Sequence, residues 1–224
     1  TMTSIKNFVG KKNICLIADK QTLGIGRRGN EWVSPKGNIY ISFLIKYDLS
    51  IEKHFLFSAL TTNSIIKFLK KYINENINIK WPNDIIINNQ KIAGIMTEIF
   101  EYNNIQYIII GAGINIFTSP EIKDYKTCSL INYKDNLKYE SVLINFIETY
   151  FHEYEMMINK NYDQILNLFK NQMSHLGSNI NILLPNGDVK KVLLKNLNLD
   201  GSLLVEDGGK EESIFSGRII NDIN

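Results

Sequence analysis

The stretch INIKWPNDIIINNQKIAG, residues 77–94, sets two short apolar runs on either side of a polar break. Isoleucine recurs through both runs, which predicts strands at residues 77–81 and 84–88. Pro82 removes a backbone donor at the break, so the polar side chains around it are expected at a strand end or bulge. A purely structural turn at the break is the alternative. Lys91 follows the second run and its turn, so this short unit contains two cations, Lys80 and Lys91.

Outward from this stretch, the apolar spacing predicts the remaining elements. Further strands are expected at residues 14–18, 39–45, 92–101 and 105–110, and helices at 50–72 with Ser50 as the cap, at 139–158 and at 162–173. From Asn179 onward, turn dipeptides such as Asn-Gly and Asp-Gly recur at close spacing, which indicates a small antiparallel barrel. We therefore expect two domains, residues 1–176 and 177–224.

Composition excludes several classes of protein. The 224 residues carry a formal net charge of only +2, without the clustered excess of a nucleic-acid surface. No apolar run reaches the roughly 18 residues of a membrane span, and the N-terminal residues lack a secretory h-region before a small-residue cleavage site, so a cytoplasmic protein is expected. Cys15 and Cys128 are far apart and favour free thiols. The three histidines show no metal-binding spacing with cysteine or glutamate.

The segment from Gly24 to Gly29 matches the GxGxxG pattern, but its context excludes the usual interpretations. A dinucleotide site needs a helix to begin inside the motif, and Pro35 with Gly37 disfavours one. No kinase HRD or DFG segment follows. Arg27 and Arg28 are two of only three arginines, the third being Arg218. The loop therefore suits a phosphate or carboxylate ligand, with a solvated basic loop as the alternative, which Trp32 disfavours.

A third glycine-rich element, Gly111-Ala112-Gly113-Ile114-Asn115, is expected directly after a buried strand. Together the three elements supply several cations, one carboxylate and neutral amides, in glycine-rich backbone. The set comprises Arg27, Arg28, Lys80, Lys91, Asp84, Asn83 and Asn115. Such a set suits a polyphosphate, usually with magnesium.

These motifs resemble those of biotin protein ligases. The matching segments are QTLGIGRRGNEW at 21–32, SPKGN at 34–38, KWPND at 80–84, KIAGI at 91–95 and GAGIN at 111–115. The resemblance covers roughly residues 1–118, and the carboxy-terminal part is more loosely similar to the family's small SH3-like domain. It implies an α+β fold: a mixed sheet with flanking helices, like class II synthetases, followed by an SH3-like barrel.

The resemblance also implies an activity and its residues. Biotin would react with ATP to give biotinyl-5′-adenylate, and a lysine of a biotin carboxyl carrier domain would then attack it. The resemblance assigns catalysis to Arg27, Lys91 and Asp84. It assigns biotin binding to Thr1, Met2, Gln21, Gly24, Ile25, Gly26, Arg27, Trp32, Lys91 and Gly94, and ATP binding to Arg27, Arg28, Trp32, Lys80, Asn83 and Asn115. Asp84 either binds Mg²⁺ or orients the acceptor lysine.

The sequence departs from the family pattern at two positions. Ile25 stands where a basic residue is common, and Thr1-Met2 stands where the family has a Ser-Thr-Asn motif, so a preceding strand is expected to be missing. A winged-helix domain is not expected before Thr1, and therefore DNA binding is not expected either. Strand edges in this fold class can pair into dimers, so a homodimer is kept as an alternative to a monomer. The rival functions are a lipoate or octanoate ligase of the same fold, which the Lys80–Asp84 segment disfavours, and a non-catalytic binding module.

Overall fold

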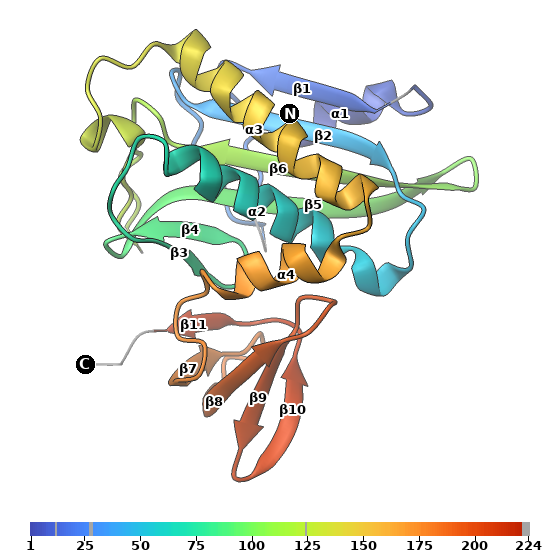
Figure 1. Ribbon diagram of the computed structural model, residues 1–224, viewed down its shortest axis with the longest axis vertical. Helices are drawn as coiled ribbons and strands as arrows, with labels where there is room; N and C mark the ends of the chain where they lie inside the picture. Colours follow the sequence, from blue (N-terminus) through green and yellow to red (C-terminus); the bar gives the residue numbers. More distant parts are fainter. Residues whose placement is uncertain (12, 27–28, 124, 221–224) are drawn as a thin grey trace.

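A six-stranded sheet forms the centre of the computed structural model, which describes residues 1–11, 13–26, 29–123 and 125–220. The strand order is β1-β2-β6-β5-β4-β3 (Figure 1). The strands are β1 (Ile14–Ala18), β2 (Ile39–Lys46), β3 (Ile77–Lys80), β4 (Asp84–Ile87), β5 (Gln90–Tyr102) and β6 (Ile105–Ile114). Every neighbouring pair is antiparallel, so the expected mixed sheet is wrong in this respect. The physical reason is that tight turns join β3 to β6 in succession, and parallel neighbours need long crossovers.

Three helices cover one face of this sheet: α2 (Phe55–Leu69), α3 (Tyr139–Ile158) and α4 (Tyr162–Lys170) (Figure 1). The core lies between the helices and the isoleucine-rich face of the strands. Helix α2 is buried along almost its whole length because α3 and α4 both pack on it. It begins later than the sequence predicts, since the short 3₁₀ helix Ile51–Lys53 precedes it.

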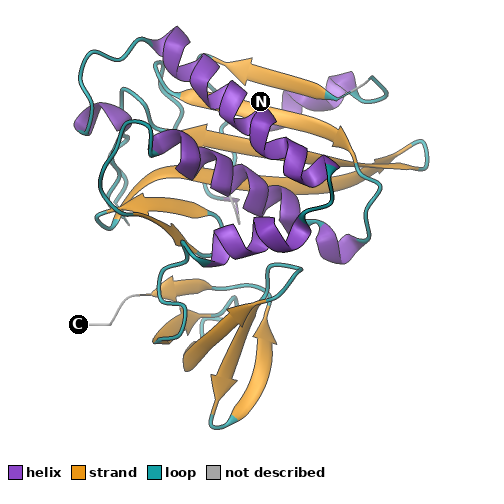
Figure 2. Cartoon of the chain, in the orientation of Figure 1, coloured by secondary structure: helices purple, strands orange, loops and turns teal. Residues whose placement is uncertain are grey.

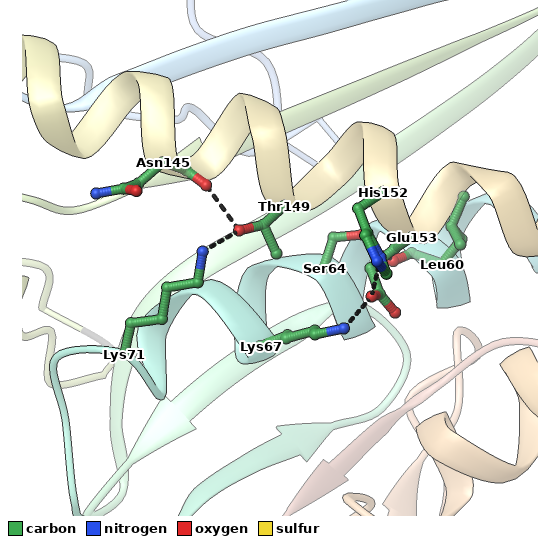
Figure 3. Close-up of polar contacts among 8 residues, drawn as sticks. All are labelled: Leu60, Ser64, Lys67, Lys71, Asn145, Thr149, His152 and Glu153. Atoms are coloured by element: carbon green, nitrogen blue, oxygen red, sulfur yellow. Dashed lines mark hydrogen bonds and ion pairs between the residues drawn. The ribbon is translucent and has the colours of Figure 1, made fainter.

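Polar contacts fix α3 to α2 above this core (Figure 3). The Lys67 ammonium pairs with the carboxylate of Glu153, which is buried. Lys71 donates a hydrogen bond of 2.7 Å from Nζ to the hydroxyl of Thr149. Paired in this way, a buried carboxylate does not carry the full cost of removal from water.

The opposite face of the sheet is covered only in part. The short helix α1 (Met2–Ile5) packs there in a small apolar cluster with Leu44, Tyr107 and Ile109. Beyond this cluster β6 continues with Gly111 and Gly113, which bear no side chains. On the face opposite α2, α3 and α4, these two positions therefore leave room for side chains from other segments of the chain.

A second sheet follows α4 and lies at the bottom of the view in Figure 2. Its strand order is β10-β9-β8-β7-β11 (Figure 1). Its strands are β7 (Asn179–Leu183), β8 (Val189–Leu197), β9 (Leu203–Asp207), β10 (Lys210–Ile214) and β11 (Arg218–Ile220). It is an open antiparallel sheet and not the closed barrel that was expected, because β10 and β11 each pair with a single neighbour among the described residues. Trp81 donates from Nε1 to the carbonyl of Gly201 at 2.8 Å, and residues of both sheets share one hydrophobic core.

Most predicted elements are confirmed within a few residues. Asn103 and Asn104 join β5 to β6 between the two strands expected there, and both residues have positive φ, as a tight hairpin requires. The main difference is that β6 runs to Ile114, so residues 111–114 belong to the strand and do not follow it. Within the described ranges, no helix is both long and apolar enough to cross a membrane.

Candidate active site

Three paired strands bring a carboxylate and two glycines into one row on the face of the large sheet opposite α2, α3 and α4. Asp84 of β4 pairs with Gly94 of β5, and Gly94 pairs with Gly113 of β6. Directly paired residues of an antiparallel sheet share a face. Gly111 adds another bare position two residues away on β6. These residues line a cavity of about 610 Å³, in which the glycines form the floor.

A β-bulge turns Lys91 toward this floor. The register between β4 and β5 shifts by one residue, which leaves Ile92 as the extra residue on β5. Ile92 and Ala93 are consecutive, yet both lie in the core, which regular alternation does not allow. Lys91 consequently lies on the same face as Gly94, and its Nζ is 2.7 Å from Oδ1 of Asp84.

Two apolar side chains lie directly on the glycine floor. A Cβ atom at Gly113 would come within 2.5 Å of Nε1 of Trp32, and one at Gly94 would come within 2.8 Å of the same indole. A Cβ atom at Gly111 would lie 2.6 Å from the sulfur of Met2. Glycine is required at these positions because any side chain would displace a wall of the cavity. Nε1 of Trp32 is buried without a hydrogen-bond partner among the described residues, which leaves a donor for a ligand.

The glycine loop folds back on itself beside the cavity. Gly26 donates from its backbone to the carbonyl of Asn30 at 2.8 Å, and Trp32 donates to the carbonyl of Gly24 at 2.9 Å. The bridge between Ile25 and Glu31 completes this hairpin-like turn. Both of these residues line the cavity, so an apolar side chain stands where the family commonly has a base.

The side chain of Gln21 links the loop to the first residues of the chain. Its Oε1 accepts a hydrogen bond of 3.0 Å from the hydroxyl of Thr1, and its Nε2 donates to the hydroxyl of Ser34 at 3.1 Å. Ser42 of β2 donates in turn to the hydroxyl of Thr1 at 2.7 Å. This chain of hydrogen bonds orients polar groups at the cavity wall, close to Met2.

Two further cations border the cavity on the side of the second sheet. Lys80 ends β3, and Arg218 begins β11. Burial lowers the pKa of the Lys80 ammonium, the positive charge of Arg218 lowers it further, and the carboxylate of Asp84 partly opposes both. Positive charges that destabilise each other in this way favour an anionic ligand between them.

Two predicted contact residues have structural partners instead. Asn115 is 2% exposed and donates from Nδ2 to the carbonyl of Cys128 at 3.0 Å, so its side chain does not reach the cavity. Asn83 lines the cavity, but its Nδ2 donates to the carbonyl of Ile95 at 2.8 Å, while Ile95 donates back from its backbone. In this structure Asn83 therefore joins β4 to β5.

The structure brings most of the predicted site residues together. The cavity is lined by Thr1, Met2, Gln21, Ile25, Gly26, Trp32, Lys80, Asn83, Asp84, Lys91 and Gly94. Gly24 supports the loop without lining the cavity, because a Cβ atom there would overlap the carbonyl of Trp32. Arg27 and Arg28 lie outside the described residues. Tyr125 and Arg218 also line the cavity, and the prediction missed both. The rarity of arginine in a lysine-rich chain was the available signal for Arg218.

The described acidic, histidine and cysteine side chains form no group of three that could hold a metal ion. Asp84 lies at the end of the glycine floor and is paired with Lys91, and Glu31 also lines the cavity. Magnesium usually binds one or two carboxylates together with substrate phosphates. The geometry therefore fits this ion only when a polyphosphate supplies further oxygen ligands.

A cavity floored by glycine, with a lysine–aspartate pair and additional cations, is the kind of site on an α+β fold that suits an acyl or phosphate ligand. The model of the biotin/lipoate A/B protein ligase family matches residues 4–115, half of the chain, and this chain belongs to that family. The bifunctional ligase/repressor BirA of Bacillus subtilis is 26% identical over 98% of this chain and 69% of its own length. The biotin–[acetyl-CoA-carboxylase] ligase of Mycobacterium tuberculosis is 23% identical over 93% of this chain and 79% of its own.

Solved structures share the fold. The biotin protein ligase of Aquifex aeolicus in complex with biotin and ATP superposes with a TM-score of 0.79, at 22% identity, over 98% of this chain and 93% of that chain. The biotin protein ligase of Leishmania major in complex with biotinyl-5-AMP gives a TM-score of 0.57 at 23% identity, over 95% and 92% of the two chains. Both sheets of this chain are therefore covered by the match to the Aquifex structure.

Proposed function

We propose that this chain is an ATP-dependent biotin–protein ligase that joins biotin to a lysine of a biotin carboxyl carrier domain through biotinyl-5′-adenylate. The observation that carries the proposal is the Lys91–Asp84 pair, which the bulge holds at the glycine floor of the cavity. The reaction needs a cation where two anions meet and a polar group to receive the acceptor amine. Membership of the ligase family and the printed names of the relatives support this choice of substrates.

In the first step a carboxylate oxygen of biotin attacks the α-phosphorus of ATP. A carbon–oxygen–phosphorus anhydride forms, and pyrophosphate leaves. The obstacle is the repulsion between the carboxylate and the phosphate, and the ammonium of Lys91, with Arg27, would offset it. Preorganised cations of this kind stabilise the developing charge, and the loss of one contact raises the barrier by about 3–4 kcal/mol.

In the second step the acceptor amine attacks the acyl carbon, AMP leaves, and the nitrogen loses a proton. In this structure the carboxylate of Asp84 is paired with the Lys91 ammonium. Once Lys91 turns to the acyl phosphate, the carboxylate of Asp84 would be free to orient the incoming amine and accept its proton. Water must be excluded because it would hydrolyse the anhydride, and closure of the loop containing Gly24 and Gly26 would exclude it.

The remaining residues fall into two groups around the floor. We propose that Thr1, Met2, Gln21, Gly24, Ile25, Gly26, Arg27, Trp32, Lys91 and Gly94 surround biotin. The triphosphate and nucleoside would meet Arg27, Arg28, Trp32, Lys80 and Asn83, and Arg218 joins this group because it lines the same end of the cavity as Lys80. Asn115 would act indirectly, through its contact with Cys128. Magnesium, when bound with ATP, would be held by Asp84 and would neutralise phosphate charge.

We further propose that residues 1–176 form the catalytic domain and residues 177–224 a smaller supporting domain. The second sheet begins at Asn179, and Arg218 extends from it to the cavity. The shared core and the hydrogen bond from Trp81 to Gly201 support a role in holding that arginine in place. The smaller domain would therefore contribute to nucleotide binding.

Labelling a purified carrier domain with biotin tests the proposal. Incorporation is expected only when ATP is present, with release of pyrophosphate, and a carrier whose acceptor lysine is changed to arginine serves as the control. Label that appears without ATP, or no ATP-dependent label at all, would contradict the proposal. Pyrophosphate release that requires both biotin and ATP would also exclude a non-catalytic binding module.

The family name includes lipoate ligases as well as biotin ligases. A lipoate or octanoate ligase is therefore the alternative function. The segment Lys80-Trp81-Pro82-Asn83-Asp84 favours biotin through its resemblance to biotin protein ligases. Parallel assays with biotin and lipoate separate the two functions. Activity with lipoate alone would overturn the choice of biotin while leaving the chemistry of the site intact.

A further inference from the structure

The ammonium of Lys91 has neighbours of two kinds. Besides the carboxylate of Asp84, two aromatic rings face it: Nζ lies 4.9 Å from the centroid of Trp32 and 5.3 Å from that of Tyr125. Both distances fall within the roughly 6 Å over which a ring attracts a cation. Tyr125 approaches from a segment far from Lys91 in sequence, and no motif pointed to it.

The segment that carries Tyr125 is bound to the backbone of Lys91 itself. Lys91 donates to the carbonyl of Lys126 at 2.9 Å, and Cys128 donates to the carbonyl of Lys91 at 3.0 Å. A parallel bridge pairs Lys91 with Thr127. Residues 125–128, here named the strap, therefore form a short added strand along β5 at the lysine. The strap fixes the backbone of Lys91 and carries a ring to its ammonium.

Contacts on its far side hold the strap in place. Thr127 donates from its hydroxyl to the carbonyl of Pro120 at 2.5 Å, and Tyr125 forms a bridge with Ile122. The amide of Asn115 holds the carbonyl of Cys128 at 3.0 Å. These contacts hold the backbone from which the ring of Tyr125 projects, which reduces the entropy lost when the ring and the ammonium meet.

From this geometry we propose that Tyr125 is a positioning residue, whose ring holds the Lys91 ammonium over the cavity while the ammonium leaves Asp84 for the acyl phosphate. A carboxylate competes with phosphate for the same cation because both are anions. A neutral ring attracts the cation through its quadrupole, carries no net charge, and stays in contact during the exchange. The inference rests on the proposed function, since it names the acyl phosphate as the second partner of Lys91.

The competing role for the ring is direct contact with the ligand, because Tyr125 is 40% exposed and lines the cavity. The two roles differ in their dependence on Lys91. If the ring acts through the ammonium, its removal has no further effect once the lysine is gone. If the ring contacts the ligand, the two effects are independent and multiply.

The test measures how fast chemically prepared biotinyl-adenylate dissociates, so that variants unable to synthesise it can still be compared. Tyr125→Leu is expected to release the adenylate about five to ten times faster than the unchanged protein, the scale of a partly desolvated cation–π contact. Tyr125→Phe keeps the ring and should stay within about twofold of the unchanged protein. The combined variant with Lys91→Ala should release it no faster than Lys91→Ala alone.

Tyr102→Leu is the matched control, because this tyrosine is exposed at the tip of the β5–β6 hairpin and does not line the cavity. Thermal unfolding of each variant reports whether the fold is retained. Multiplying effects in the combined variant, or equal losses in Tyr125→Phe and Tyr125→Leu, would overturn the inference and assign the ring or the hydroxyl to the ligand. Failure of the unchanged protein to form adenylate from biotin and ATP would instead count against the proposed function.

Discussion

The two faces of β6 carry different kinds of residue although they alternate along one strand. Ile110, Ala112 and Ile114 face the helices and belong to the core. Gly111 and Gly113, which alternate with them, face the cavity and leave room for Met2 and Trp32. One face of β6 thus packs in the core, and the other face leaves room for the side chains that line the cavity. Substitutions at neighbouring positions are therefore expected to affect stability and ligand binding separately.

The largest effect is expected on the cavity side, from Lys91→Ala. Adenylate formation should fall about 100- to 1,000-fold, because the cation beside the developing phosphate charge is lost. Stability should change little, since the lysine side chain faces the cavity and its ion pair is partly open to solvent. Single-turnover pyrophosphate release and thermal unfolding measure the two quantities, and a variant with unchanged rates would show that the site is misplaced.

On the core side, Ile110→Ala should cost about 2–5 kcal/mol of the free energy of unfolding. Ile110 is fully buried between β6 and the helices, so its truncation leaves a cavity. The folded fraction should still bind biotinyl-adenylate as the unchanged protein does. Denaturant titration and a binding assay at low temperature test the separation; a loss of binding without a loss of stability would refute it.

A smaller effect on the cavity side is expected from Gly113→Ala. The added methyl group would displace the indole of Trp32, and adenylate should dissociate about tenfold faster, the equivalent of about 1.4 kcal/mol. Ala112→Gly is the neighbouring control on the core face. It should lower stability by roughly 0.5–1 kcal/mol and leave dissociation unchanged. Equal dissociation rates in both variants would remove the distinction between the faces.

The smallest effect concerns protons at Lys80, whose pKa is lowered by burial and by Arg218. A bound triphosphate brings negative charge, which raises that pKa again and favours the protonated ammonium. ATP binding in alkaline solution should therefore take up protons, whereas Lys80→Met should take up fewer. Calorimetry in buffers of different ionisation enthalpy measures the number of protons taken up. Equal proton uptake by the unchanged protein and by Lys80→Met would show that the phosphates bind away from Lys80.

Alternation in the sequence was sufficient to predict most strands, because their faces differ so strongly in polarity. It failed at Gly111–Ile114, where glycine suggests the end of a strand. In the structure these residues pair with β5 on one side and β2 on the other, so the neighbouring strands hold the glycines in the sheet. The pairing direction of the sheet and the open form of the second sheet depend on tertiary contacts that periodicity does not encode.

The structure brings Lys80, Asp84 and Lys91 together at one cavity, and in the sequence these are places where polar residues interrupt apolar strands. The resemblance assigned a nucleotide contact to Asn115, but in the structure its amide donates to the carbonyl of Cys128 in the strap. Tyr125 could not have been found, because only the folded chain brings it to Lys91. The roles of the individual residues remain predictions.

The bulge in β5 has a consequence for insertions and deletions. Residues three apart in a regular strand face opposite sides, yet Lys91 and Gly94 share one because an extra residue lies between them. Lys91 and Gly94 already lie opposite Ile86 and Asp84, which are two residues apart on β4. Loss of the codon for Ile92 would therefore leave the lysine on the cavity side and remove the local bend that the bulge gives the strand. Such a deletion would change the direction in which the Lys91 ammonium points and would leave the lysine itself in place. Evolution or a protein engineer could therefore adjust the position of this charge by inserting or deleting one residue.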